Sequence, residues 1–382
     1  MINILFIHQS SDLYGSDRTL LLLLKHIDRK KFFPVVILPN VGPLKVELEK
    51  ENIEVVIAPV LKLYRKMFSP KNLITFFTDI KKGLKICDDL DRKYNFDIIY
   101  SNTLAVLLGV FFARKAKIKH IWHVHEIIVH PKIFANLFPH LLNKYADLVI
   151  CNSISTKKNL TDRIGFLKQK TLVVYNGVEI NKEKNTASTE GIFNFEEDSV
   201  IISLVGRISR LKGHKWLLET YLKYAKEMNN VKILFVGSPV IGQEYYLKEI
   251  EEIVKKNHLT NTVKILPFQK DLSQVWSITD IAIMPSTEAE SFGLVAIEAM
   301  LANKPVIGSN HGGLTEIIIN NETGFLVEPN NEKQLSESLQ KLIENEDLRK
   351  QFGSAGYQRA INQFSIDKYV SSIENLFDKI LK

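Results

Sequence analysis

The sequence lacks the features that mark disulfide-rich, membrane-spanning or secreted proteins. Cysteine is scarce: only Cys87 and Cys151 occur among 382 residues, too few for a disulfide scaffold and without metal-ligand spacing. The longest apolar run, Leu104 to Ala113, is about half as long as a membrane-spanning helix requires. The first residues, MINILFIHQS, contain neither a basic leader nor a small-residue cleavage site, which favours a first strand over a signal peptide. We therefore expect a protein of the reducing cytoplasm.

The length and composition are typical of a soluble enzyme with two domains. A chain of 382 residues exceeds the size at which one hydrophobic core keeps growing, and its 45% hydrophobic and 24% charged fractions are ordinary. The net charge of +7 is uneven, since residues 1–180 carry 27 Lys and Arg against 16 Asp and Glu. This basic half favours contact with an anionic lipid or a phosphate-bearing acceptor. A merely basic, solvated surface is the alternative, and no nucleic-acid partner is expected.

Short β-branched runs alternate with longer amphipathic stretches, a pattern typical of βα units and parallel sheets. In the first half the runs are Ile2–His8, Val35–Leu38, Glu54–Ala58, Asp97–Ser101, His120–Val124, Asp147–Cys151 and Leu172–Tyr175. In the second half they are Val200–Val205, Val231–Val236, Val263–Leu266, Ile281–Met284, Pro305–Ile307 and Gly324–Val327. Helical patterns between the runs include Thr19–Ile27 and Asn72–Arg92, and Ser153 is a plausible N-cap before Thr156–Leu160.

A polar, aperiodic stretch, residues 181–199, follows the Asn176-Gly177 turn and is predicted to be a linker. We therefore predict an α/β protein with two doubly wound, Rossmann-like domains, residues 1–180 and 199–364. A ligand crevice is expected between them, at the carboxyl ends of the strands.

The most informative segment is MPSTEAESFGLVAIEAM, residues 284–300. A helix is predicted to begin near Leu294, and the free N–H groups at its start favour a phosphate. Glu290 precedes that start and Glu298 lies within the helix, eight residues on. A carboxylate can accept both hydroxyls of a vicinal diol, so this pattern suits a sugar nucleotide, which has a diol at each end of a diphosphate. The alternative is that both acids are solvated charges.

A basic cluster follows the run Val200–Val205, in the order Gly206-Arg207-Ile208-Ser209-Arg210-Leu211-Lys212-Gly213. Arg207 can form a fork to phosphate oxygens, and Lys212 can add a point charge. The alternative is that both are surface charges capping the following helix. Together with Glu290 and Glu298, they strengthen the prediction of a phosphate-bearing ligand.

Two segments of the first half are weaker candidates. Glycine in the Gly15-Ser16 loop lets the backbone approach a ligand, although a simple strand-to-helix turn is the better interpretation and GxGxxG is absent. His123 and His125, at i and i+2, lie on one face of a strand end, where a histidine can hydrogen-bond a sugar hydroxyl. A metal there is disfavoured, because no third ligand is evident and HExxH is missing.

These segments together resemble the retaining family-4 glycosyltransferases of the GT-B fold. Glu290 and Glu298, with seven residues between them, resemble the EX7E motif, and its surroundings resemble the PS…E-x-FG…EAM context. The resemblance covers essentially the whole chain, and its C-terminal motifs are specific as a set, whereas the N-terminal ones are weak. Further matching segments are Lys304-Pro305-Val306-Ile307, Gly312-Gly313, Thr323-Gly324-Phe325-Leu326-Val327 and, as an interdomain signature, Asn176-Gly177-Val178.

The resemblance implies a donor-binding role for several residues of the second half. Arg207 and Lys212 would bind the donor diphosphate, Glu298 the ribose diol and Glu290 the hydroxyls of the transferred sugar. The backbone amides that would complete the phosphate site are those near Gly293, Leu294 and Val295. The resemblance also implies metal independence, which fits a phosphate charge met by Arg207, Lys212 and a helix start, so no metal and no cofactor are expected.

In the first half, the resemblance places His125 near the sugar and the acceptor. It assigns Gly15 only an approximate match to the family's glycine loop, since Gly-Gly is here Gly15-Ser16. The family's last helix returns to the first domain, so residues 365–382 are expected to do so.

The implied reaction is transfer of a hexose-type sugar from a UDP- or GDP-sugar with retention at the anomeric carbon. Front-face attack, with the acceptor proton passing to a donor phosphate oxygen, is expected in place of a covalent intermediate on Glu290. Three alternatives stay open: a nucleotide-sugar epimerase or hydrolase, a non-catalytic two-lobed sugar-binding protein, and an α-glucan synthase, although its Lys-Thr-Gly-Gly-Leu motif is missing. As a hypothesis, the acceptor is a glycan or polyprenyl-diphosphate-linked glycan for a surface polysaccharide, reached at the inner face of the plasma membrane through Lys62, Arg65 and Lys66.

Overall fold

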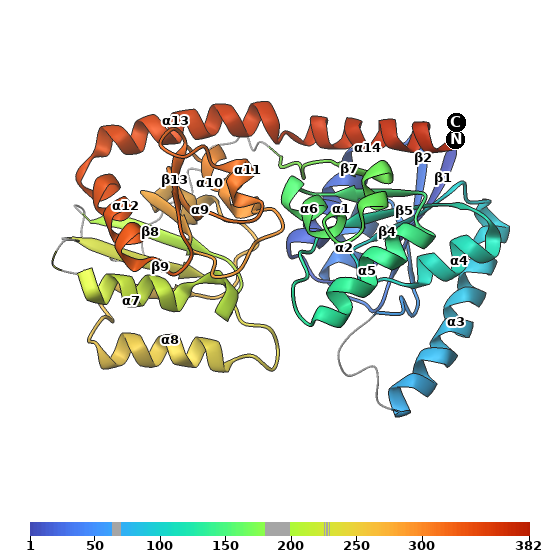
Figure 1. The fold of residues 1–382 in the computed structure, drawn as a ribbon, viewed down its shortest axis with the longest axis horizontal. Helices are drawn as coiled ribbons and strands as arrows, with labels where there is room; N and C mark the ends of the chain where they lie inside the picture. Colours follow the sequence, from blue (N-terminus) through green and yellow to red (C-terminus); the bar gives the residue numbers. More distant parts are fainter. Residues whose placement is uncertain (63–69, 180–198, 225, 227, 229) are drawn as a thin grey trace. The chain divides into compact units, whose positions relative to one another are not determined.

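The computed structural model describes residues 1–62, 70–179, 199–224, 226, 228 and 230–382 (Figure 1). Of the predicted linker only Ser199 falls within this range, and of the basic stretch Lys62-Leu63-Tyr64-Arg65-Lys66-Met67-Phe68 only Lys62 does. The chain divides into two compact units. Unit 1 comprises Met1–Glu179 and Ser365–Lys382, and unit 2 comprises Ile180–Phe364.

Unit 1 is built on a parallel sheet whose seven strands follow the order β3-β2-β1-β4-β5-β6-β7. Its strands are β1 (Ile2–His8), β2 (Phe32–Leu38), β3 (Glu54–Ile57), β4 (Ile98–Asn102), β5 (Lys119–Val124), β6 (Leu148–Cys151) and β7 (Thr171–Val173). These strands are rich in Ile and Val and mostly buried on both faces, as parallel strands are. The order reverses between β1 and β4, and that pair is in register from Ile4 opposite Ile98 to His8 opposite Asn102.

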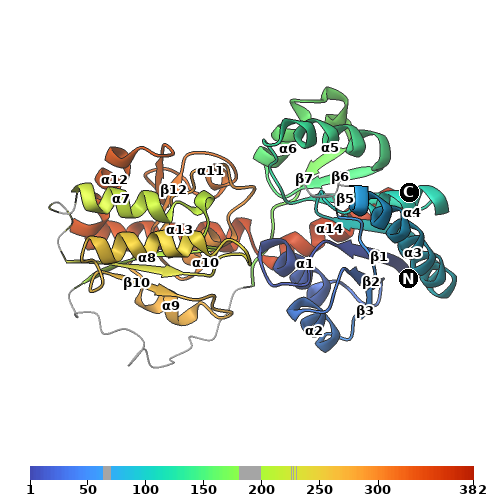
Figure 2. The same ribbon diagram turned by 90° about the horizontal axis from the view of Figure 1, so that it is seen from below.

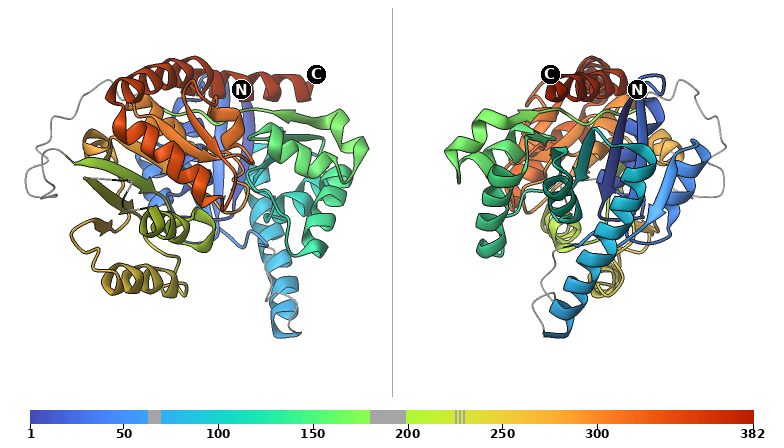
Figure 3. Two further views of the ribbon diagram at one scale, coloured as in Figure 1. Left: turned by 60° about the vertical axis from the view of Figure 1, so that its left-hand side comes forward. Right: turned by 90° about the vertical axis from the view of Figure 1, so that its right-hand side faces the viewer.

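Helices cover both faces of this sheet (Figure 2). They are α1 (Gly15–His26), α2 (Pro43–Lys50), α3 (Pro70–Tyr94), α4 (Leu108–Ala116), α5 (Lys132–Tyr145), α6 (Ile154–Thr161), the 3-10 helix η2 (Gly165–Lys170) and α14 (Ile366–Leu381). One core lies under α1, α2 and α14, and the other under α3, α4, α5 and α6. The start of α3 projects away from the sheet of unit 1 (Figure 3).

Helix α14 belongs to unit 1 although it follows unit 2 in the sequence. Its apolar stripe, which includes Tyr369, Ile373 and Phe377, packs beside α1 in the core of unit 1. The backbone N–H of Ile366 donates to the carbonyl oxygen of Val178 at 3.2 Å, so the helix is also tied to the end of the first half.

Unit 2 contains a second parallel sheet, in the order β10-β9-β8-β11-β12-β13. Its strands are β8 (Val200–Val205), β9 (Val231–Val236), β10 (Val263–Leu266), β11 (Ile281–Met284), β12 (Val306–Ser309) and β13 (Gly324–Val327). Its helices are η3 (Arg210–Lys212), α7 (His214–Tyr224), α8 (Tyr245–Lys256), α9 (Ser273–Ile278), α10 (Leu294–Leu301), α11 (Leu314–Ile317), α12 (Glu332–Glu344) and α13 (Glu346–Gln363). The two sheets confirm the predicted pair of Rossmann-like domains.

Local details agree with the sequence at α6 and differ at α1. Ser153 is the N-cap of α6, as predicted, and its hydroxyl accepts from the backbone N–H of Thr156 at 2.9 Å. Helix α1 begins four residues earlier than the predicted Thr19, so Gly15 is its first residue and not part of a loop. The reason is local, because the Asp17 carboxylate accepts from the N–H of Tyr14 at 2.9 Å and closes the first turn.

Among the described residues, no helix is both long enough and apolar enough to cross a membrane.

Candidate functional site

The loops after β8 and β11 meet where the strand order of unit 2 reverses. The backbone N–H of Thr287, after β11, donates to the carbonyl oxygen of Leu211, after β8, at 2.9 Å. In doubly wound sheets, the carboxyl ends of the strands beside such a reversal form the ligand-binding edge. The predicted residues Arg207 and Lys212 follow β8, and Glu290 follows β11, so the topology brings them to one edge.

Lys212 and Glu290 form an ion pair at this edge. The distance from Lys212 Nζ to Glu290 Oε1 is 2.8 Å, and the two side chains are 30% and 15% exposed. The hydroxyl of Ser286 donates to the same oxygen. Burial by itself raises the pKa of Glu290, but the charge of Lys212 and the hydrogen bonds from Lys212 and Ser286 outweigh it and lower that pKa. Glu290 is therefore held as a carboxylate.

Glycines allow the loops around this pair to touch. Gly213 has φ +74°, and a Cβ there would lie 1.7 Å from the carbonyl oxygen of Pro285. Gly312 has φ +63°, and a Cβ there would lie 2.3 Å from the carbonyl oxygen of Glu290. The next residue, Gly313, donates its N–H to that same carbonyl at 2.7 Å. The backbone of Glu290 is thus held by Gly312 and Gly313, and that of Pro285 is approached by Gly213.

Helix α10 begins directly after this loop. Gly293 is its N-cap, with φ +126°, and Leu294 and Val295 form its first turn. The first N–H groups of a helix have no intrahelical partner and favour an anion. Glu298 lies one turn further on, and both of its carboxylate oxygens are covered. A covered carboxylate is not the solvated charge that the sequence left as the alternative.

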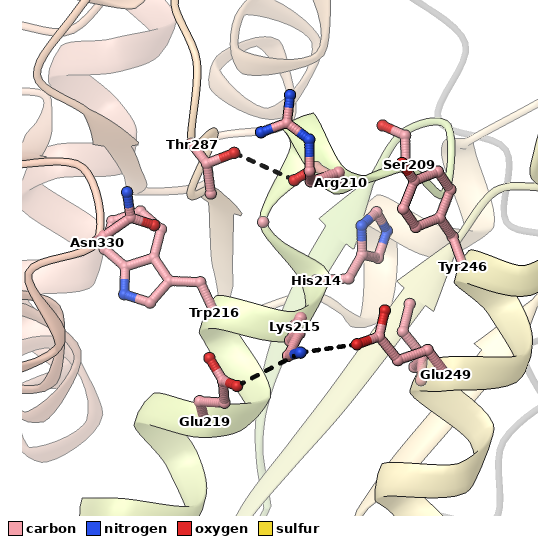
Figure 4. A pocket seen from close by; sticks show the side chains of 12 residues that line it. Ser209, Arg210, His214, Lys215, Trp216, Glu219, Tyr246, Glu249, Thr287 and Asn330 are labelled. Atoms are coloured by element: carbon pink, nitrogen blue, oxygen red, sulfur yellow. Dashed lines mark hydrogen bonds and ion pairs between the residues drawn. The ribbon is translucent and has the colours of Figure 1, made fainter.

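A pocket of about 150 Å³ lies beside this edge, at the start of α7 (Figure 4). Lys215 is paired there with Glu219 on α7 and with Glu249 on α8. The ring of His214 is buried, and neither nitrogen has a hydrogen-bond partner among the described residues. None of the predicted donor-binding residues lines this pocket, although Gly213, next to Lys212, does. Its lining is Ser209, Arg210, Gly213, His214, Lys215, Trp216, Glu219, Tyr246, Glu249, Ile250, Thr287 and Asn330.

In unit 1, polar side chains end the three neighbouring strands β1, β4 and β5. His125 Nε2 lies 2.9 Å from Asn102 Oδ1, and Asn102 Nδ2 lies 3.0 Å from His8 Nδ1. His8 Nε2 in turn lies 2.6 Å from Asp17 Oδ1 on α1. All four residues are buried. Burial, helped by the neighbouring His123 and His8, holds the pKa of His125 well below its usual range, so its ring is neutral near pH 7.

The two histidines at the end of β5 lie close together but have different partners. The rings of His123 and His125 lie 4.0 Å apart, centroid to centroid, but His123 is hydrogen-bonded to the phenol of Tyr100. Burial lowers the pKa of His123 to about 3. In the part of the chain that the structure describes, no group of three or more His, Cys, Asp and Glu side chains is arranged to hold a metal ion. The adjacent Glu126 instead accepts from the backbone N–H groups of Leu104 and His125, both at 3.1 Å.

Several residues of these two sites were not predicted. Ser286 belongs to the Glu290 loop, and His311, which follows β12, contacts the carbonyl oxygen of Ser286 through its ring at 3.0 Å. Asn102, His8 and Asp17 were missed in unit 1. The available signal was a polar residue at the end of each buried strand, in FIH for β1 and IYSN for β4.

Comparison with known proteins identifies the class to which this architecture belongs. The family described as glycosyl transferases group 1 matches residues 186–359, and glycosyltransferase family 4 matches residues 14–182. An uncharacterized glycosyltransferase of Methanocaldococcus jannaschii is 30% identical over 304 residues, which cover 78% of this chain and 79% of that protein. The chain belongs to the family-4 glycosyltransferases and has the GT-B fold, as the sequence predicted.

Two further relatives are informative. CapM of Staphylococcus aureus, a capsular polysaccharide biosynthesis glycosyltransferase, is 27% identical over 329 residues, covering 82% of this chain and 84% of CapM. The crystal structure of HepE of Anabaena in complex with UDP-glucose superimposes with a TM-score of 0.84 at 26% identity. That match covers 99% of this chain and 100% of HepE.

Proposed function

We propose that this glycosyltransferase transfers a hexose from a UDP-sugar, with retention of anomeric configuration, to a lipid-diphosphate-linked glycan for a surface polysaccharide. The observation that carries the proposal is the Lys212–Glu290 pair, at the reversal of strand order and next to the start of α10. UDP is favoured over GDP because HepE binds UDP-glucose, and a polysaccharide is favoured because CapM acts in capsule synthesis.

The proposed contacts involve the diphosphate, the ribose and the transferred sugar of the donor. Arg207, Lys212 and the N–H groups of Leu294 and Val295 would neutralise the diphosphate, which is the charge that develops as it leaves. Glu298 would accept the ribose hydroxyls. Oε2 of Glu290 is suited to the sugar hydroxyls, because the hydrogen bonds from Lys212 and Ser286 both use Oε1. We expect turnover to persist in a chelator-containing buffer.

Attack on the same face of the sugar as the leaving diphosphate accounts best for retention. The bond from the anomeric carbon to the diphosphate oxygen breaks, the acceptor oxygen bonds that carbon, and its proton passes to a phosphate oxygen of the leaving group. Glu290 is not assigned as a covalent nucleophile, because its role here is to hold the sugar hydroxyls, whereas a double displacement needs a carboxylate beneath the anomeric carbon. His125, neutral and buried at the edge of unit 1, would contact a hydroxyl of the sugar.

Calorimetric titration of UDP, GDP, ADP and CMP without metal tests the donor site. Wild type should bind UDP, and Glu298→Ala should weaken that binding at least tenfold, by the loss of one charged hydrogen-bonding group. Glu288→Ala, which removes an exposed acid of the same loop, serves as the matched control and should bind normally. If the protein binds GDP in place of UDP, the donor is a GDP-sugar. If it binds none of the four nucleotides, the proposal is refuted.

Product analysis separates a transferase from the alternatives. With donor and acceptor, transfer should require both, and Glu290→Ala should lose turnover while remaining folded and able to bind UDP. Consumption of the UDP-sugar without any acceptor would favour an epimerase or hydrolase. Unchanged sugar under all conditions would favour the binding protein.

An outer surface of unit 1 supports contact with an anionic membrane. Helices α5 and α6 both contact η2, and these elements expose Ile133, Ile154 and Phe166, the first and last at 70% and 76%. Residues 132–170 carry seven Lys and Arg against two Asp and Glu. Exposed apolar side chains among basic ones are typical of a surface that rests on anionic lipid.

Vesicle sedimentation tests this contact. The protein should bind phosphatidylglycerol vesicles at low salt and not phosphatidylcholine vesicles, and the double variant Ile133→Ser, Phe166→Ser should bind less. Ile241→Ser, which removes an exposed apolar residue from unit 2, is the control. Reversal of the charges at Lys62, Arg65 and Lys66 tests the sequence-based hypothesis separately. A protein that ignores anionic vesicles at low salt would rule the membrane contact out.

A further inference from the structure

The buried side chains at the ends of β1, β4 and β5 form a continuous chain of hydrogen bonds from Asp17 to His125. The links are Asp17 to His8 at 2.6 Å, His8 to Asn102 at 3.0 Å, and Asn102 to His125 at 2.9 Å. Because an amide and two imidazoles can each be oriented in more than one way, the direction of every link has to be worked out.

The direction is set at the Asp17 end. A carboxylate only accepts hydrogen bonds, and Asp17 also accepts the N–H of Tyr14, at 2.9 Å, with its other oxygen. His8 must therefore donate from Nε2. In the neutral form of that ring the remaining nitrogen, Nδ1, is an acceptor. It lies 3.0 Å from Asn102 Nδ2, which donates to it, and 3.4 Å from the backbone carbonyl oxygen of Asn102. With Nδ1 unprotonated, the longer contact joins two acceptors and is not a hydrogen bond.

A backbone carbonyl fixes the Asn102 amide independently. Nδ2 of Asn102 lies 3.5 Å from the carbonyl oxygen of Ser16, a group that only accepts. The NH₂ end of the amide thus faces two acceptors, and Oδ1 is left facing His125. Since Oδ1 only accepts, His125 must carry its proton on Nε2, and in a neutral ring Nδ1 then holds a lone pair.

We propose that Asp17, His8 and Asn102 are positioning residues that hold His125 as its neutral Nε2–H tautomer and present the Nδ1 lone pair to a hydroxyl group of the transferred hexose. No described residue donates a hydrogen bond to Nδ1 of His125. Nδ1 is also not one of the fully covered polar atoms without a hydrogen-bond partner, so part of its surface is open. It is the ring nitrogen that a ligand can reach. The proposal rests on the proposed function, which supplies the sugar.

The tautomer can be read directly by ¹⁵N NMR of the full chain labelled at histidine. Ten histidines contribute signals, and His125 is assigned by the pair lost in His125→Gln. In wild type, Nε2 of His125 should be protonated and Nδ1 unprotonated at pH 7. A protonated Nδ1, with or without a proton on Nε2, would overturn the proposal, and the tautomer itself is read in the wild-type protein.

Substitutions then test the relay, by which we mean the chain of hydrogen bonds from Asp17 through His8 and Asn102 to His125. Asn102→Ala should convert His125 to a mixture of tautomers, and Asn102→Asp, which places a carboxylate against both imidazoles, should shift it towards the doubly protonated form. Ser101→Ala is the matched control: Ser101 is the neighbouring buried residue, hydrogen-bonded to His120 at 2.9 Å on the opposite face of β4. It should leave the His125 signals unchanged. If both Asn102 variants also leave them unchanged, the relay does not exist.

Kinetics separates positioning from folding. Asn102→Ala should lower kcat roughly tenfold, as for one misdirected hydrogen bond, while the dissociation constant for UDP stays within twofold, because the residues proposed to hold the diphosphate and the ribose, Arg207, Lys212 and Glu298, belong to unit 2. Asp17→Asn should change the His125 spectrum in the same direction but less, and it serves if the Asn102 variants do not fold. An absence of transferase activity with a correct wild-type tautomer would refute the proposed function and leave the relay standing.

Discussion

The two sheets reverse their strand order in the same way but place opposite kinds of side chain at the reversal. Unit 2 places an ion pair there, Lys212 with Glu290, partly exposed and next to the start of α10. Unit 1 places imidazole and amide groups there, with the carboxylate of Asp17 hydrogen-bonded inside the unit. The first arrangement suits a diphosphate, which needs positive charge and N–H donors. The second suits a neutral hydroxyl.

In both units the topology brings polar side chains to one edge of the sheet, and the charge of those side chains differs between the two edges. Both sites come from the carboxyl ends of adjacent strands. At one, Lys212 keeps an acid ionised by lowering the pKa of Glu290. At the other, burial keeps a base neutral by lowering the pKa of His125. Substitutions at each edge test whether these two behaviours are separable.

The largest effect is expected from breaking the ion pair. Glu290→Gln and Lys212→Met should each lower kcat by about 10²–10³-fold, the scale of removing one charge-stabilising group from an active site. Because the two residues share one interaction, the double variant should lose less than the product of the single losses. Steady-state kinetics of all four proteins gives the coupling. Multiplicative losses would mean that the pair does not act as a unit.

A backbone contact should matter next. Gly213→Ala would force a Cβ into the carbonyl oxygen of Pro285, and at φ +74° it would add strain, so we expect about 3 kcal/mol loss in the free energy of unfolding of unit 2. Gly242→Ala is the matched control, since φ is +84° but nothing lies within 4 Å of the added carbon. It should cost about 1 kcal/mol. Urea denaturation measures both, and equal losses would contradict the steric argument.

The buried histidines should make the protein acid-sensitive. Burial lowers the pKa of His120 to about 4 and that of His214 to about 3, whereas an unfolded chain takes up the proton near pH 6.5. Between those values the unfolded state binds more protons, so stability is full above pH 6.5 and falls on acidification by about 1.4 kcal/mol per pH unit for each histidine. Urea midpoints from pH 8 to pH 5 measure the slope.

The two histidines differ in how they should respond to substitution. His214→Leu should flatten the slope and cost little at pH 8, because neither nitrogen of His214 is hydrogen-bonded to a described residue. His120→Leu should also flatten the slope but lose about 1–3 kcal/mol at pH 8, since Ser101 and the carbonyl oxygen of Tyr145 both contact its ring. If the two variants lose similar amounts of folding free energy at pH 8, the contacts of His120 with Ser101 and Tyr145 contribute nothing to stability.

The unit 2 site was largely predictable from the sequence, and the unit 1 site was not. Arg207, Lys212, Glu290 and Glu298 stand in two short segments that each follow a recognisable strand, so adjacency along the chain carried most of the information. The direct contact between Lys212 and Glu290 was not predicted, because it depends on β8 lying beside β11.

In unit 1, the residues that contact one another are far apart in the sequence. His8 and Asn102 are separated by 94 residues, and Asn102 and His125 by 23. They meet only because the sheet places β4 between β1 and β5. A sequence of strands does not specify their order, so Asn102 had no local pattern to mark it. His125 itself was predicted, by its place at a strand end.

The smallest effect, and the sharpest control for the whole comparison, is expected at a second ion pair of the same two loops. Arg210 and Glu288 each lie two residues before a member of the Lys212–Glu290 pair, but they are 62% and 51% exposed. Water and salt screen such a pair, so Arg210→Ala should change the free energy of unfolding by less than about 1 kcal/mol. It should also leave kcat within twofold.

Titration with UDP at 50 and 500 mM salt completes the test. Lys212→Met should lose affinity for UDP at both salt concentrations, whereas Arg210→Ala should differ from wild type only at low salt, through its long-range charge. Equal losses for the two cations would show that the position of a charge in these loops, and not its pairing with Glu290, governs the donor site.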